Sequence, residues 1–101
     1  MQNTDRNGYF PSIVQTEREC YIKSCRRTDV LHRHEPLDGI GRRSKSKELG
    51  LWVYLCPYHH AMSHNDRQLQ DELREDCERA ALRQYGWTTQ DFINEFGKNY
   101  I

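Results

Sequence analysis

The distribution of cysteine and histidine is the feature of this 101-residue chain that most restricts its fold. All five histidines and three of the four cysteines lie between Cys20 and His64. They form three groups, which are Cys20 with Cys25, His32 with His34, and the run Cys56-x-x-His59-His60-x-x-x-His64. Such pairs at short spacing are typical of metal ligands. With only 36% hydrophobic residues, so short a chain buries a thin core and gains folding free energy from a bound metal.

One set of these residues has the composition of a structural zinc site. Cys20 and Cys25 are separated by four residues, and Cys56 and His59 by two. Three thiolates and one imidazole make a closed tetrahedral set, which structural zinc prefers. We therefore predict a structural Zn²⁺ ion that ties an N-terminal turn to the end of a central strand. Cys77 belongs to the apolar stripe of a helix, and we expect it in the core.

The remaining histidines indicate a second, more open metal site. His60 and His64 are four residues apart, so a helix that starts near Pro57 or His59 places them on one face. The other side of the site would come from the strand at 32–35. A metal with few protein ligands keeps positions for water and a phosphate oxygen, as catalytic sites do. An unbound histidine nearby can act as general base.

The order of expected elements is that of a small α+β domain. We predict strands at 30–36 and 51–56, and a weaker one within 12–22. Residues 38–50 read as mostly loop with a helical turn at 44–49. Helices are expected at 66–85 and from Thr88, the first stopped by Gly86 and the second by Gly97. Residues 1–12 are predicted to be a flexible leader, and 13–101 a single domain.

Charge is divided unevenly along a chain whose formal net charge is zero. Residues 23–47 hold eight Lys or Arg against three Asp or Glu, whereas residues 66–95 hold four against eight. A basic patch is typical of a phosphate-backbone contact, although a solvated surface is the alternative. The candidates for DNA binding are Arg33, Arg42, Arg43, Lys45 and Lys47, together with Arg26 and Arg27. We expect no membrane span and no secretion signal, hence a cytoplasmic protein with reduced thiols.

The central part of the chain resembles a known family. The similarity is carried by Leu31-His32-Arg33-His34-Glu35-Pro36, by Gly39, Arg42, Arg43 and Ser46, and by the run 50–57 with His59-His60 after it. These residues resemble the small HNH endonuclease-like proteins of bacteriophages and prophages, and the ending 96–101 is similar too. The resemblance implies a ββα-metal (His-Me finger) domain, with two strands and a helix around one divalent ion, and a structural zinc. The helices predicted at 66–85 and from Thr88 would follow this finger at its C-terminal end.

The resemblance also implies roles for individual residues. His60 and His64 would bind the catalytic ion, which would be Mg²⁺, Mn²⁺, Ni²⁺ or Zn²⁺. Glu35 would bind this metal while His34 activates water, or His34 would bind metal and leave Glu35 or His32 as the base. These alternatives stay open at this point.

The expected function is that of a phage-encoded, metal-dependent endonuclease that hydrolyses DNA phosphodiester bonds inside a bacterial host cell. One alternative is a binding module of the same fold with a decayed site, which holds DNA or inhibits a host protein. Another is a purely structural zinc protein. Ala61 stands where similar proteins often carry Asn, which favours the binding module, whereas His60 and His64 beyond the zinc set favour the enzyme. No oligomer interface is readable from the sequence.

Overall fold

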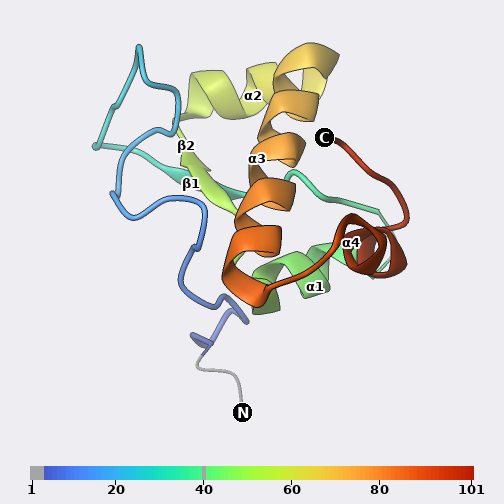
Figure 1. Cartoon of the computed structure of the whole chain (residues 1–101). Coiled ribbons are helices and arrows are strands. Elements are labelled where there is room, and N and C mark those ends of the chain that lie inside the picture. The colour runs from blue at the N-terminus through green and yellow to red at the C-terminus, as the bar shows by residue number, and fades with distance from the viewer. Residues whose placement is uncertain (1–3, 40) are drawn as a thin grey trace.

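The computed structural model describes residues 4–39 and 41–101, and these ranges contain two strands and four helices (Figure 1). Along the chain the elements are β1 (His32–His34), α1 (Arg42–Leu49), β2 (Val53–Leu55), α2 (Pro57–Asn65), α3 (Arg67–Tyr85) and α4 (Thr89–Phe96). The protein is therefore a small α+β domain, as the sequence predicts.

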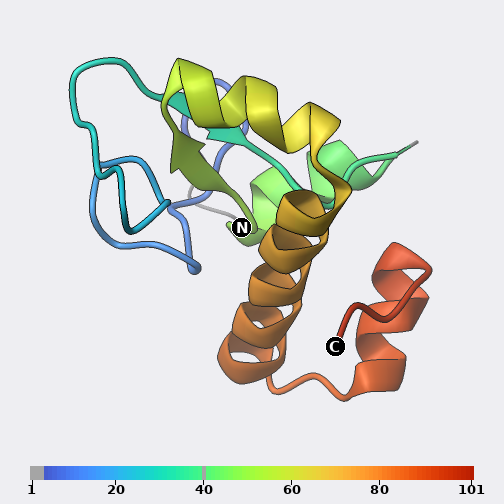
Figure 2. The ribbon, with the colours of Figure 1, turned by 90° about the horizontal axis from the view of Figure 1, so that it is seen from above.

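The two strands form an antiparallel pair whose register decides which side chains share a face. His32 pairs with Leu55, Arg33 with Tyr54, and His34 with Val53. Side chains alternate along a strand, and directly opposite residues point to the same side. The two histidines therefore lie on one face of the pair, and Arg33 and Tyr54 on the other. Helix α2 packs against both strands, as Figure 2 shows.

The boundaries of the C-terminal helices follow from their capping residues. Asp66 accepts a hydrogen bond from the Leu69 N–H and starts α3 directly after α2. Thr88 and Asp91 form a reciprocal capping box at the start of α4. Gly86 and Gly97 end the two helices in the left-handed conformation. The predictions for both helices are confirmed.

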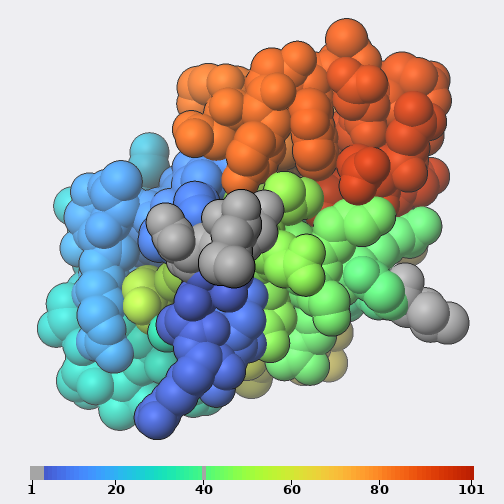
Figure 3. Space-filling view, turned by 90° about the horizontal axis from the view of Figure 1, so that it is seen from below, coloured from blue at the N-terminus to red at the C-terminus, as the bar shows by residue number. Residues whose placement is uncertain are grey.

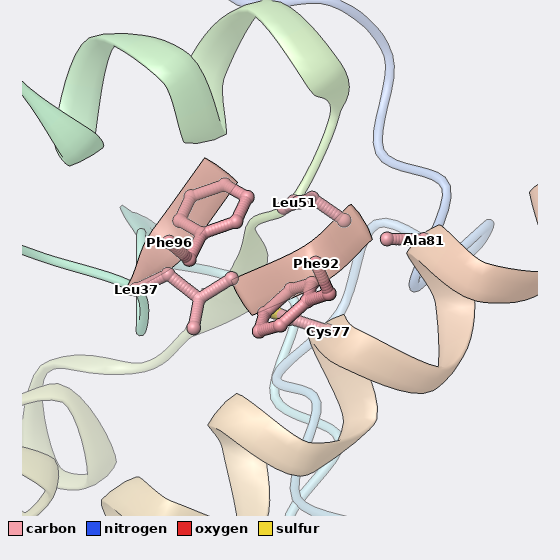
Figure 4. Packing of buried hydrophobic residues seen from close by; sticks show 6 residues of the cluster. All are labelled: Leu37, Leu51, Cys77, Ala81, Phe92 and Phe96. Atoms are coloured by element: carbon pink, nitrogen blue, oxygen red, sulfur yellow. The ribbon is translucent and has the colours of Figure 1, made fainter. Parts of the chain in front are cut away.

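The main apolar core lies between α3, α4 and the segments that flank α1. Figure 4 shows Phe92 and Phe96 of α4 gathered with residues from α3 and with the loop residues Leu37 and Leu51. Cys77 has no exposed surface, and burial raises the pKa of its thiol. It packs with these side chains in the core, as predicted. A second buried cluster, around Val53, Leu55 and Leu73, connects the sheet to α3.

Two expectations about the first half of the chain are wrong. No strand forms within 12–22, where Ser12 and Gln15 hold the chain through side-chain hydrogen bonds. Gln15 Oε1 accepts from the Tyr54 N–H and its Nε2 donates to the Glu19 carbonyl, so side-chain bonds replace those of a strand.

The segment expected to be mostly loop contains the complete helix α1. Ser46 is the buried residue of this helix, and its hydroxyl donates to the Leu37 carbonyl. Because this contact is polar, α1 lacks the apolar stripe by which a helix is recognised in a sequence. Ile40, in the same predicted loop, lies outside the described residues.

The segment predicted as a flexible leader makes several contacts with the domain. Residues 1–3 lie outside the described residues. The Phe10 N–H donates to the Lys47 carbonyl, the Trp52 indole N–H donates to the Phe10 carbonyl, and Ser12 donates to the Trp52 carbonyl. Figure 3 shows this blue segment lying against the green surface of α1. These contacts attach residues 10–12 to the region between α1 and β2.

The docking of this segment makes a prediction about Gly50. Its φ is +75°, and a Cβ there would collide with the Pro11 carbonyl oxygen. Gly50→Ala should lower the free energy of unfolding by about 2–4 kcal/mol, from left-handed strain plus the clash. Gly86→Ala is the matched control, because Gly86 has φ +65° and an added Cβ would meet no atom. This substitution should lower the free energy of unfolding by only about 1 kcal/mol. Urea unfolding measures both. Equal losses would show that Pro11 does not pack here in solution.

Candidate metal centres

The predicted zinc ligands meet in one group. Cys20, Cys25, Cys56 and His59 each offer an atom, and these atoms lie within 4.8 Å of one another. The Cys25 and Cys56 Sγ atoms are 3.8 Å apart, and the His59 Nδ1 lies 3.3 Å from the Cys56 Sγ and 3.6 Å from that of Cys20. A tetrahedral zinc ion with ordinary bond lengths would place sulfur atoms about 3.8 Å apart, and sulfur and nitrogen about 3.6 Å apart. The donor set therefore fits a tetrahedral metal ion.

Local structure positions these four side chains. Cys20 and Cys25 belong to a loop closed by hydrogen bonds from the Cys20 N–H to the Arg27 carbonyl and from the Cys25 N–H to the Ile22 carbonyl. Cys56 follows β2 and caps the N-terminus of α2, where its sulfur accepts from the His59 N–H. Burial acts to raise the pKa of the Cys56 thiol, but hydrogen bonds from His59 and contacts with the other two thiols lower it to about 7. This thiol is therefore easily converted to the thiolate that binds metal.

A second group unites histidines from β1 and α2. His34, His60 and His64 offer nitrogen atoms within 4.8 Å of one another. His60 and His64 are one helical turn apart on α2, as predicted, and His34 faces them from the strand. Burial lowers the pKa of His34, and burial with the neighbouring histidines lowers that of His60 to about 4. Neutral imidazole is the form that binds metal, so this group fits a divalent ion with open coordination positions.

Gln70 of α3 fixes the orientation of the His34 ring. Its Nε2 donates to the Pro36 carbonyl, which leaves its Oε1 to accept from the His34 Nε2–H at 2.8 Å. The free lone pair of His34 is then on Nδ1. Sequence reasoning missed Gln70, although a signal exists. It stands one turn before Leu73 and two before Cys77, so it is a polar residue on the buried stripe of α3.

His32 lies at the edge of this group. Its Nδ1 is 2.9 Å from the Nδ1 of His60, so one ring donates a hydrogen bond to the other. It is exposed, whereas His34 is buried and His60 half-buried. The Nε2 atom of His32 takes no part in the contact with His60.

Glu35 directly follows β1, lines the same hollow as the three histidines and is only 6% exposed. The Tyr9 hydroxyl donates to its Oε2 at 2.6 Å, and the Arg43 Nε–H donates to its Oε1 at 2.5 Å. Burial, together with this carboxylate, raises the pKa of Tyr9 to about 12. Both oxygens of Glu35 are therefore engaged, and this carboxylate orients Arg43. Nothing in the sequence pattern pointed to Tyr9.

A pocket of about 300 Å³ opens beside the three histidines. It is lined by Arg33, His34, Glu35, Asp38, Arg43, His60 and His64. Two of the seven residues predicted to bind DNA, Arg33 and Arg43, thus line this pocket.

The other predicted DNA-binding residues lie elsewhere. Lys45 pairs with Glu95 of α4 at 3.2 Å, and the Lys47 ammonium lies 4.7 Å from the centre of the Tyr9 ring. Arg42 lies next to Gly97 at the end of α4. Arg26 and Arg27 form ion pairs with Glu19 and Asp29. The basic segment of the sequence is therefore spread over several faces of the domain.

Comparisons with protein-family models, with curated proteins and with solved structures found no match to this chain. None of the helices in the described ranges is both long and apolar enough to cross a membrane. What the centre can do therefore follows from its own residues.

The four-ligand group predicts how metal content responds to substitution. The purified protein should hold one transition-metal ion tightly, and Cys56→Ala should lose it and unfold more easily, because three ligands bind far more weakly than four. Cys77→Ala is the control, since this cysteine is buried but is not part of the group. It should keep the ion. Metal analysis after dialysis, with thermal unfolding, measures both, and unchanged metal content in Cys56→Ala would contradict the assignment.

Proposed function

We propose that this protein is a metal-dependent endonuclease that hydrolyses DNA phosphodiester bonds, built on a ββα-metal arrangement of the HNH type. In this proposal β1, β2 and α2 form the finger, and α3 and α4 are additions that complete the core. The observation that carries the proposal is the pocket where three histidines that could hold a metal ion lie beside Arg43. A structural protein has no need for such a pocket.

The two ligand groups would hold different ions. The cysteine-rich group suits Zn²⁺, because it offers three thiolates and one imidazole in a closed set. His34, His60 and His64 would hold the catalytic ion, for which Mg²⁺, Mn²⁺, Ni²⁺ and Zn²⁺ are the candidates. That ion, when bound, supplies a Lewis acid for the charge that develops on the phosphate during hydrolysis.

The remaining residues of the pocket receive roles from their contacts. Because His34 lies with the other two ligands and Glu35 is engaged by Tyr9 and Arg43, we assign neither as the general base. An ion bound at His60 would replace the hydrogen bond between His32 and His60. The exposed His32 ring would then have a nitrogen free to take a proton from water, so it is the proposed base. Arg43 would bind a phosphate oxygen with the part of its guanidinium that Glu35 leaves free.

The direct test is the nicking of supercoiled plasmid by the zinc-loaded protein in Mg²⁺, Mn²⁺ or Ni²⁺. Nicking should require the added ion, stop on its chelation, and be lost in His34→Ala and His60→Ala. Both variants should keep their zinc and their fold, because neither residue belongs to the cysteine group. His32→Ala should bind the ion normally yet cut at least about 100-fold more slowly, as expected when a general base is removed.

The outcome also separates the enzyme from a binding module. A folded, zinc-bearing protein that cuts no plasmid with any of these ions would refute the endonuclease proposal. It would favour the module with a decayed site that holds DNA or a protein partner. If His60→Ala unfolded together with Cys56→Ala, the division into two separate metal groups would be wrong.

Arg43 and Arg42 offer a matched pair for testing phosphate contact. They are adjacent in α1, but only Arg43 reaches the histidine pocket. Arg43→Ala should weaken DNA binding about tenfold at moderate salt and reduce the slope of log K against log salt by about one, because one phosphate contact is lost. Arg42→Ala should have less effect on both. Equal effects in the two variants would place the phosphate contact outside the pocket.

A further inference from the structure

A larger cavity, of about 650 Å³, lies on the other face of the strand pair. It is bounded by Arg33 of β1 and Tyr54 of β2, which are paired in register, and by Trp52, the residue before β2. The N-terminal segment closes its other side with Asp5, Tyr9 and residues 10–12. None of the roles proposed above uses this cavity.

The walls of the cavity combine aromatic rings with guanidinium groups. The Trp52 and Tyr54 ring centres are 4.9 Å apart, and those of Tyr9 and Trp52 are 5.5 Å apart. The Arg33 guanidinium lies 4.3 Å from the Tyr9 ring centre, and that of Arg18 lies 5.4 Å from the Tyr54 ring centre. Planar rings beside arginines are what proteins use to stack unpaired bases while their cations contact the sugar–phosphate chain.

The charges within the cavity differ between the two arginines. Arg33 is paired with Asp5 at 2.7 Å, so its charge is balanced within the protein. Arg18 is exposed and forms no ion pair with the described residues. Its guanidinium can therefore leave the Tyr54 ring and bind a phosphate, while a base takes its place on the ring.

This cavity adjoins the histidine pocket. Arg33 lines both, and Tyr9 of the cavity donates its hydroxyl hydrogen to Glu35 of the pocket. A nucleic acid strand whose phosphate lies by the histidines therefore has the aromatic cavity within reach of a neighbouring nucleotide. The cavity and the histidine pocket open on opposite faces of the β1–β2 pair. The nucleic acid would therefore pass around the edge of this pair at Arg33.

We propose that the cavity bounded by Arg33, Trp52 and Tyr54 binds an unpaired nucleotide, with its base stacked on Tyr54 and its phosphate held by Arg18. This inference rests on the proposed endonuclease function for its place in the reaction. It makes the preferred substrate a DNA with a single-stranded segment beside the cut, since a paired base cannot enter the cavity without leaving its helix.

The test compares two oligonucleotides of equal charge. One is an eight-nucleotide strand of thymidines, and the other is the same backbone with all bases removed. Binding is measured on zinc-loaded protein that carries Trp87→Phe together with His60→Ala, with no other divalent ion added, so that no cutting occurs. Trp52 is then the sole tryptophan, and its fluorescence reports on the cavity.

The thymidine strand should quench Trp52 fluorescence and bind at least about tenfold more tightly than the abasic strand, as expected for a stacked base. Tyr54→Leu should reduce its affinity to that of the abasic strand. Tyr58→Leu is the control, because Tyr58 is 67% exposed on α2 and does not line the cavity. It should leave the difference intact.

Equal binding of the two oligonucleotides would overturn the proposal without any substitution in the cavity. A folded Tyr54→Leu protein that kept the full difference would overturn it as well. These outcomes are independent of the nicking assay. A protein that cuts duplex plasmid but binds both oligonucleotides equally would support the endonuclease proposal and refute nucleotide binding in the cavity. A protein that cuts no plasmid but prefers the thymidine oligonucleotide would refute the endonuclease proposal and support nucleotide binding.

Discussion

The arrangement of the histidines depends on how the first turn of α2 is held. This helix has Ser63 as its buried residue, so apolar burial does little to fix it. Its N-terminal turn instead brings Cys56 and His59 against Cys20 and Cys25, which come from a loop without helix or strand. In our account a zinc ion closes this group and supplies the missing free energy. The same turn of helix then sets the direction in which His60 and His64 point.

The short strand β1 gives the proposed active site two chemically different sides. Alternation places His32 and His34 toward α2, and Arg33 and Glu35 toward the N-terminal segment. One side offers imidazoles for a metal ion, whereas the other offers charged groups that Tyr9 and Asp5 hold in place. Arg43 crosses from α1 to join the two, because it binds Glu35 and lines the histidine pocket. In this account, β1 and the residue that follows it organise metal binding, phosphate binding and the adjoining aromatic cavity.

Residue spacing was enough to predict which cysteines and histidines lie close together, but not which other residues contact and orient the site. The pairs Cys20/Cys25 and Cys56/His59, and the turn from His60 to His64, are set by local geometry and were predictable. The capping box at Thr88 was as well. By contrast, only a turn of α1 was predicted, because Ser46 buries a hydroxyl and not an apolar group. Tyr9 and Gln70 act across 26 and 36 residues of chain, and no local pattern reveals such contacts. The role of Glu35 was also not predictable, because its hydrogen bonds with Tyr9 and Arg43 engage the carboxylate that would otherwise bind metal or act as a base.

The central claim is that α2 serves two metal ions with separate ligand sets. A crystal of the zinc-loaded protein soaked in Mn²⁺, with anomalous diffraction recorded for each metal, tests it most directly. We predict a zinc peak among Cys20, Cys25, Cys56 and His59, and a manganese peak between His34, His60 and His64. A single peak in the cysteine group, with manganese absent from the histidines at saturating concentration, would contradict the account.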